Sequence, residues 1–366
     1  MTGAAAHQVR DVRAGGQRRL YIDWLRGVAV FVMILWHTVD SWHVREGRQT
    51  AGFLTVSFLA GWAAPLFLFL AGVSLPMAGL SRMARGIDRA SAARALMHRG
   101  WQVFLIAHLF RLQSFLLNPG ARWSGLLKPD ILNILGLGMV AAAYGWGRAD
   151  SARARLMWLL LPAVGVVVIL TPLAPTWWWP TLMPPRLEAY IRPVGNQGVF
   201  SLFPPVGYVF AGAFVGAWLA ERSGSTEREF HVRIAIWGIG LLAAGLGLAF
   251  LPTPAWSAMW VRPVSTVSWR IGAMLLLLAL SWWWLGVRTP GVNNPLMVFG
   301  RTSLFVYWVH VELAYGVFSL PLRNALSLPW ALTAYALFTV AMYGCAVLWL
   351  RRPVRPLVPA HMRAPG

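Results

Sequence analysis

The chain has 366 residues, of which 58% are hydrophobic and 12% are charged, and its mean hydropathy is +0.57. This composition, with apolar runs along the whole length, argues against a soluble protein and predicts an all-α, polytopic integral membrane bundle. The formal net charge of +20 comes from arginines in short segments between the apolar runs. We therefore attribute the charge to membrane orientation and expect no nucleic acid partner.

Ten apolar runs predict ten transmembrane helices. They lie at about 20–42, 53–79, 99–118, 130–147, 156–172, 200–220, 232–252, 264–286, 295–318 and 329–350. Of the 32 Lys and Arg residues, 20 lie in the two tails and in the loops on their side of the membrane, eight lie in the opposite loops and four lie within spans. Because cytoplasmic loops are enriched in basic residues, we predict that both termini are cytoplasmic.

The predicted organisation is a cytoplasmic tail (1–19), a single transmembrane domain (20–350) and a second cytoplasmic tail (351–366). The first 19 residues are polar and basic, and the first apolar run has no small-residue cleavage site near its end. We therefore expect that run to remain as an uncleaved anchor.

The first apolar run contains Asp23, Arg26, His37 and Asp40. Ionisable groups at membrane depth are costly and usually functional. Arg26 and His37 are eleven residues apart, so on a helix they share one face at a separation of about 16 Å. Arg26 is placed to clamp an anionic group from the cytoplasm, because guanidinium matches phosphate bidentately, or else to snorkel to lipid headgroups.

His37 and Asp40 are three residues apart, which on a helix allows the carboxylate to orient the imidazole. This arrangement of orienter and base is used to deprotonate a nucleophile. The alternative is a helix end where both side chains meet water. His43, three residues further on, is a second candidate for the reacting histidine, although we expect it in the loop and wet.

Further polar residues occur in later spans. His108 and Arg111 are three apart in the third span, and Asp130 and Asn133 open the fourth, so they either pair across helices or contribute to a site. His310 lies mid-span near the end of the chain and is the better pocket candidate there, because Glu312, two residues later, points to another face. No metal is expected, since no His-Glu-x-x-His or paired-cysteine spacing exists.

Two features of the loops and glycines complete the pattern. The loop at 173–199 contains Trp177, Trp178 and Trp179, which predicts either a cover over a pocket mouth or an interfacial aromatic belt. Small-residue faces predict close helix packing. They are formed by Gly212 and Gly216 and by Gly238, Gly240, Gly245 and Gly247.

Five blocks carry a family resemblance. In chain order they are RLYIDWLRGVAVFVMILWH, WAAPLFLFLAGVSL, KPDILNILGLG, FSLFPPVGYVFAGAFVGAWL and NPLMVFGRTSLFVYWVH. Together they resemble the bacterial membrane proteins related to heparan-α-glucosaminide N-acetyltransferase. The Arg followed eleven residues later by His is also similar to the first-span motif of membrane acyltransferases that O-acylate surface glycans.

The resemblance implies an acyl-CoA-dependent acyltransferase in the bacterial inner membrane. It would take an acetyl or other acyl group from cytoplasmic acetyl-CoA (acyl-CoA) and place it on a sugar or glycan at the far side. Arg26 would then hold the donor, with Arg111 and His108 beside it. His37 would be the base or transient acyl carrier with Asp40 as its orienter, and His310, Asp130 and Asn133 would line the acceptor pocket. A homo-oligomer is compatible with this architecture.

One departure concerns the reacting histidine. The animal enzyme has an asparagine where His37 aligns and uses a histidine somewhat later, for which His43 is the counterpart here. The rival interpretation of the whole chain is a transporter or flippase for a glycan or an anion. A third is a haem-binding electron carrier that uses His37, His108 or His310.

Overall fold

The computed structural model describes residues 19–117, 123–195, 200–287 and 294–352, and these contain helices but no β-strand. The predicted tails lie outside the described residues except for Arg19 and residues 351–352. The main helices are α2 (Leu20–Trp42), α3 (Ala51–Ala60), α4 (Ala63–Met83), α5 (Arg89–Leu117), α6 (Ile131–Arg148), α11 (Pro205–Leu219), α12 (Ser225–Phe250), α13 (Ala255–Val287), α14 (Pro295–Arg301), α15 (Ser303–Tyr315) and α16 (Leu328–Arg351). Between α6 and α11 lie the shorter helices α7 (Ala152–Arg155), α8 (Leu161–Gly165), α9 (Thr171–Leu173) and α10 (Pro185–Ile191), with π-helical turns at Leu156–Leu160 and Val166–Leu170.

Each of the ten predicted spans falls on helix, and the all-α polytopic fold is confirmed. Within the described residues, seven helical segments are long and apolar enough to cross a membrane. They are Leu20–Trp42, Ala51–Met83, Trp123–Arg148, Ala152–Thr176, Ser225–Phe250, Ser257–Val287 and Leu328–Arg351. The other three predicted spans coincide with α5, α11 and α14–α15, so a count of ten crossings remains a prediction.

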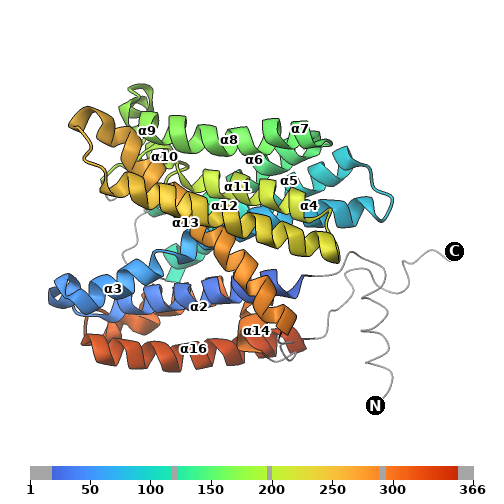
Figure 1. Cartoon of the computed structure of the whole chain (residues 1–366). Coiled ribbons are helices and arrows are strands. Elements are labelled where there is room, and N and C mark those ends of the chain that lie inside the picture. Colours follow the sequence, from blue (N-terminus) through green and yellow to red (C-terminus); the bar gives the residue numbers. More distant parts are fainter. Residues whose placement is uncertain (1–18, 118–122, 196–199, 288–293, 353–366) are drawn as a thin grey trace, which may run out of the picture.

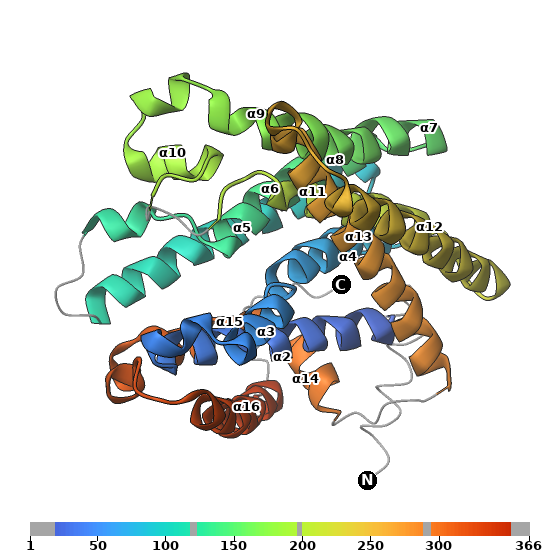
Figure 2. The same cartoon turned by 60° about the vertical axis from the view of Figure 1, so that its left-hand side comes forward.

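Helix α2 is the hub of the bundle. It contacts α3, α4, α13, α14, α15 and α16, and 13 of its 23 residues are buried. Figures 1 and 2 show α2, α3 and α16 on one side of the molecule and α7 to α9 on the other, with α13 crossing between them. The start of α2 and the ends of α13 and α16 lie at one end of the bundle (Figure 1). We call this the basic end, because it is the end predicted to face the cytoplasm.

Close crossings between helices depend on glycines that have no room for a side chain. On α11, a Cβ added at Gly212 would lie 2.0 Å from the Phe69 carbonyl oxygen, and one at Gly216 would lie 2.2 Å from that of Val73. The predicted packing role of these two glycines is therefore confirmed, and their partner is α4.

The glycines of α12 divide into two pairs. Gly238 and Gly245 lie against α13, where an added Cβ would come within 2.8 Å and 2.4 Å of backbone atoms. Gly240 and Gly247 have open space within 4 Å, so for these two the packing prediction is wrong. The tightest crossing is between α2 and α14, where a Cβ at Gly300 would lie 1.8 Å from the Asp23 carbonyl oxygen.

Candidate functional site

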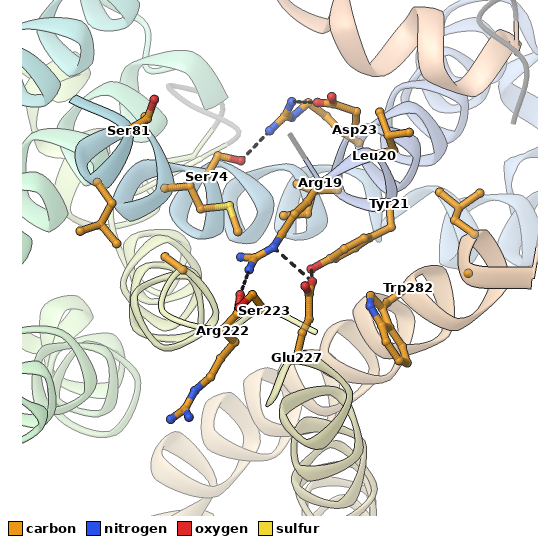
Figure 3. A pocket seen from close by; sticks show the side chains of 18 of the residues that line it. Arg19, Leu20, Tyr21, Asp23, Ser74, Ser81, Arg222, Ser223, Glu227 and Trp282 are labelled. Atoms are coloured by element: carbon orange, nitrogen blue, oxygen red, sulfur yellow. Dashed lines mark hydrogen bonds and ion pairs between the residues drawn. The ribbon is translucent and has the colours of Figure 1, made fainter. Parts of the chain in front are cut away.

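A cavity of about 990 Å³ opens at the basic end of the bundle between α2, α4, α12 and α13 (Figure 3). Three arginines and two carboxylates contribute to its wall. They are Arg19, Arg26, Arg222, Asp23 and Glu227. The excess of cations and the partly apolar lining suit an anionic ligand that also has apolar parts.

Arg26 lines this cavity, as the donor-clamp prediction requires, but it is already engaged. Its guanidinium pairs with the Asp23 carboxylate at 2.9 Å and donates to the Ser74 hydroxyl at 2.6 Å. Ser74 on α4 in turn donates to the Leu70 carbonyl. These contacts fix the orientation of Arg26 and show that it does not snorkel freely, although they also neutralise part of its charge.

A second polar group on the same wall was not predicted from the sequence. Tyr21 donates to Glu227 at 2.8 Å, and Arg19 forms an ion pair with the same carboxylate oxygen at 3.1 Å (Figure 3). Arg19 also donates to the Arg222 carbonyl. Glu227 is one of only 12 acidic residues in the chain and stands just before an apolar run. In the sequence, the rarity of acidic residues was the one feature that could have identified Glu227 as a site residue.

His37 and His310 form the centre of a second group, farther along α2. The distance from His37 Nδ1 to His310 Nε2 is 2.8 Å, and the rings stack with centroids 5.0 Å apart. His310 is fully buried, whereas His37 is partly exposed. His310, placed in the acceptor pocket from its sequence position, is thus the direct partner of His37.

The hydrogen bonds assign the tautomers of this pair. His310 Nδ1 lies 2.5 Å from the Val306 carbonyl oxygen. A carbonyl only accepts, so Nδ1 carries the proton and the Nε2 of neutral His310 is an acceptor. His37 Nδ1 must then donate to it, which leaves the lone pair of neutral His37 on Nε2. The nitrogen that is free to take a proton therefore belongs to the more exposed of the two rings.

The sequence predicted that the Asp40 carboxylate orients the His37 ring, but the hydrogen bond to His37 is made by His310. The Asp40 carboxylate accepts from the Tyr315 hydroxyl at 2.8 Å and lies 3.5 Å from the Arg48 guanidinium. Arg48 also donates to the Asp40 carbonyl oxygen at 2.5 Å. Tyr315 connects Asp40 to the pair indirectly, because its ring lies edge-on to His37 at 5.6 Å.

The sequence predicted His43 in a loop exposed to water, and this prediction is wrong, because the residue is only 3% exposed. Its Nδ1 donates to the Leu326 carbonyl at 3.0 Å, and its ring stacks on Phe53. Its Nε2 is buried and has no partner among the described residues. A Cβ at Gly47 would lie 2.4 Å from that nitrogen, so the backbone of the following turn occupies the approach a substrate would need.

The polar residues of α5 and α6 meet as the sequence suggested. Arg111 forms an ion pair with Asp130 at 2.8 Å, and Tyr307, which the sequence analysis missed, donates to the other Asp130 oxygen at 2.6 Å. The Asn133 amide lies 3.1 Å from His108 Nδ1 and, through its oxygen, caps the start of α6 by accepting from the Asp130 amide.

Helix α15 connects the Arg111–Asp130 ion pair with the His37–His310 pair. Its Tyr307 and His310 are one turn apart, and their rings meet edge-on at 5.9 Å. Arg111 and His108 lie with Asp130 and Tyr307 and are not among the residues that line the cavity. Their placement beside a donor stays a prediction. Tyr190 of α10 lies within electrostatic range of Arg111 and Asp130, and burial raises the pKa of its phenol to about 12.

The tryptophan-bearing segment lies at the opposite end of the bundle from the cavity (Figure 1). Trp178 is 72% exposed. Arg192 holds the segment together by donating to the carbonyls of Pro175 and Trp177 and to the Glu188 carboxylate. The segment does not cover the cavity described above. Its two predicted roles, a cover over another pocket mouth and an interfacial aromatic belt, stay predictions.

The part of the chain that the structure describes offers no cluster of side chains for a metal ion. There, no three His, Cys, Asp or Glu side chains lie close enough to hold a metal ion. His37 and His310 each use a ring nitrogen on the other.

A comparison with known protein families shows to which family the chain belongs. The chain matches the family model described as "Heparan-alpha-glucosaminide N-acetyltransferase, catalytic" over residues 18–247, which is more than half of its length. The chain belongs to this family. No curated protein matches it. The matched range includes Arg26, His37, Asp40 and His43 but ends within α12, so His310 lies beyond it.

Family membership confirms the relation to heparan-α-glucosaminide N-acetyltransferase and, with the apolar helices, indicates a multi-pass membrane protein and a transferase of the N-acetyltransferase kind.

Proposed function

We propose that this protein transfers an acetyl group from acetyl-CoA (acyl-CoA) at the basic end of the bundle to a sugar or glycan acceptor that reaches His37 from the opposite side. The observation that carries the proposal is that one helix, α2, contributes residues both to the cavity and to the His37–His310 pair. Its first two turns line the cavity, and its His37–His310 pair lies about 16 Å further along the same face.

The donor would occupy the cavity. Arg222 supplies a cation whose guanidinium has no ion pair among the described residues, and its Nε is buried without a partner. Helix α12 begins beside it at Ser225, and the partial positive charge of a helix N-terminus adds to the attraction for phosphate. Arg26, held by Asp23 and Ser74, is the cavity-lining residue of α2 that is nearest to His37 along the helix.

In direct transfer, His37 Nε2 takes the proton of the acceptor amine or hydroxyl while that atom attacks the thioester carbonyl. The carbon–sulfur bond then breaks, and the CoA thiolate receives the proton. In the two-step form, Nε2 attacks the carbonyl and CoA leaves as its thiolate. The acceptor then displaces the acyl group from the imidazole, its proton passes to the freed Nε2 and on to water, and the thiolate is protonated from water. In both forms, His310 accepts from His37 Nδ1 and keeps Nε2 free.

The orientation follows the charge distribution. We place the basic end, with both termini, in the cytoplasm of a bacterial cell and the molecule in the inner membrane. The His37–His310 pair would then serve an acceptor on the far side.

The test is transfer from radiolabelled acetyl-CoA to an amino-sugar oligosaccharide by the purified protein in detergent. We expect His37→Ala to abolish transfer, Asp40→Asn to lower it modestly, and the exposed His98→Ala to leave it unchanged. Activity that survives in His37→Ala but is lost in His43→Ala would reassign the reacting histidine. Label retained on the protein without acceptor would identify the two-step form.

The transporter alternative gives a separable result. Reconstituted in vesicles, a transporter moves the glycan or anion without consuming acetyl-CoA, whereas the proposed enzyme consumes acetyl-CoA only as acceptor is modified. Glycan movement with no acyl transfer would refute the proposed function.

A further inference from the structure

The chain has three consecutive tryptophans near the basic end of α13, and they do not behave alike. Trp283 is 59% exposed and Trp284 is 40% exposed, as expected for an aromatic belt at a membrane interface. Trp282 is turned inward and contributes to the wall of the cavity (Figure 3). An indole on a cavity wall is a different feature from a belt, because it offers a flat surface to whatever the cavity holds.

One face of the Trp282 ring is backed by His231. The two rings are almost parallel, with an interplanar angle of 13° and centroids 4.6 Å apart. No other ring contact of Trp282 occurs within the described ranges. Trp282 also lines the cavity, whereas His231 does not, so part of the indole that His231 leaves uncovered faces the cavity.

His231 is itself held in place and makes a rigid support. It is 2% exposed, and its Nε2 lies 3.2 Å from the Tyr21 hydroxyl. Because that hydroxyl donates to Glu227, Nε2 must carry the proton and donate to the Tyr21 oxygen. Phe230 and Tyr21 both pack edge-on to the imidazole, at 5.2 Å. The indole orientation is thus fixed by a support that reaches back to α2.

From this arrangement we infer that the cavity recognises the nucleotide half of the donor, with the adenine ring stacked on Trp282 and the adjacent phosphates bound by Arg222. The inference rests on the proposed function and names the subsite within it. Base stacking on an aromatic side chain is one of the standard ways in which proteins hold a nucleobase, and guanidinium is the preferred partner of phosphate. Both residues are among those that line the cavity.

The first experiment uses adenosine 3′,5′-bisphosphate, the nucleotide half alone, as a competitor of acetyl-CoA and as a titrant of the full-length protein. We expect it to bind the wild type, and Trp282→Leu to weaken binding on the order of tenfold to a hundredfold. Trp282→Phe should lose less, because a smaller stacking surface remains. The matched control is Trp283→Leu, which removes the neighbouring exposed indole and should bind as the wild type does. Equal binding by Trp282→Leu and the wild type would overturn the inference.

The second experiment compares two donors, acetyl-CoA and S-acetyl-4′-phosphopantetheine, which lacks the adenosine. In Trp282→Leu we expect KM to rise for acetyl-CoA and to stay unchanged for the shorter donor, with kcat similar for both. Equal losses on both donors would mean that Trp282 is only structural, and the inference would fail. If neither donor supports transfer by the wild type, the proposed function fails instead, and the titration alone still decides whether a nucleotide binds at Trp282.

Discussion

The hydrogen bond between His37 and His310 makes the sharpest prediction about activity. Replacing His310 by Leu removes the acceptor, 2.8 Å away, for the Nδ1 proton of His37. In the proposed reaction the His37 ring becomes a cation, and a hydrogen bond from a charged donor contributes about 1.5–3 kcal/mol. We therefore expect kcat to fall about 10- to 150-fold. The KM for acetyl-CoA should change little, because the cavity lies at the other end of α2.

His310→Gln is the matched variant, since its amide oxygen reaches about as far as the lost Nε2 and can accept from His37. We expect it to recover part of the lost rate. The assay measures initial rates with radiolabelled acetyl-CoA at saturating acceptor, with thermal unfolding in detergent as a check that both variants fold. If folded His310→Leu keeps more than half of the wild-type kcat, or if the Leu and Gln variants lose activity equally, His310 does not act as an acceptor for His37.

The remaining predictions concern packing, topology and the polar group of α15. Gly300→Ala should lower the unfolding temperature markedly, at a cost of about 2 kcal/mol or more, because its Cβ would meet backbone of α2, whereas Gly240→Ala has open space and should be neutral. Cysteines at Ser151 and Thr181, introduced without the native cysteine, should label from opposite sides of the membrane; labelling of both from outside would contradict cytoplasmic termini. Tyr307→Phe removes a hydrogen bond to a buried carboxylate and should cost about 1.5–3 kcal/mol in thermal or denaturant unfolding; an unchanged unfolding curve would argue against that bond.

Local sequence rules determined the class of the protein and the layout of its first helix. Apolar runs fixed where helices form, because hydrocarbon requires every backbone group to be paired within the helix. The spacing of eleven between Arg26 and His37 put both on one face, and the structure places Arg26 at the cavity and His37 at the histidine pair. Five ordered blocks carried the resemblance that the family match confirms.

The partners of those residues depended on tertiary packing. Asp40 is a helical neighbour of His37, yet its carboxylate pairs with Tyr315 and Arg48, because α15 and the turn after α2 bring stronger donors to it. The contact between His37 and His310 joins residues 273 positions apart, and no periodicity within one helix could predict it.

The same limit applies to the glycines and the tryptophans. A helix sequence shows that Gly238 and Gly240 are small, but the rotation of α12 against α13 decides that only Gly238 lies in the contact. Likewise, the sequence presents Trp282 and Trp283 as one aromatic run. Trp282 lies on the cavity wall and Trp283 on the exposed surface because of the direction in which α13 crosses the bundle. That direction is set by the fit between helices rather than by any helix alone.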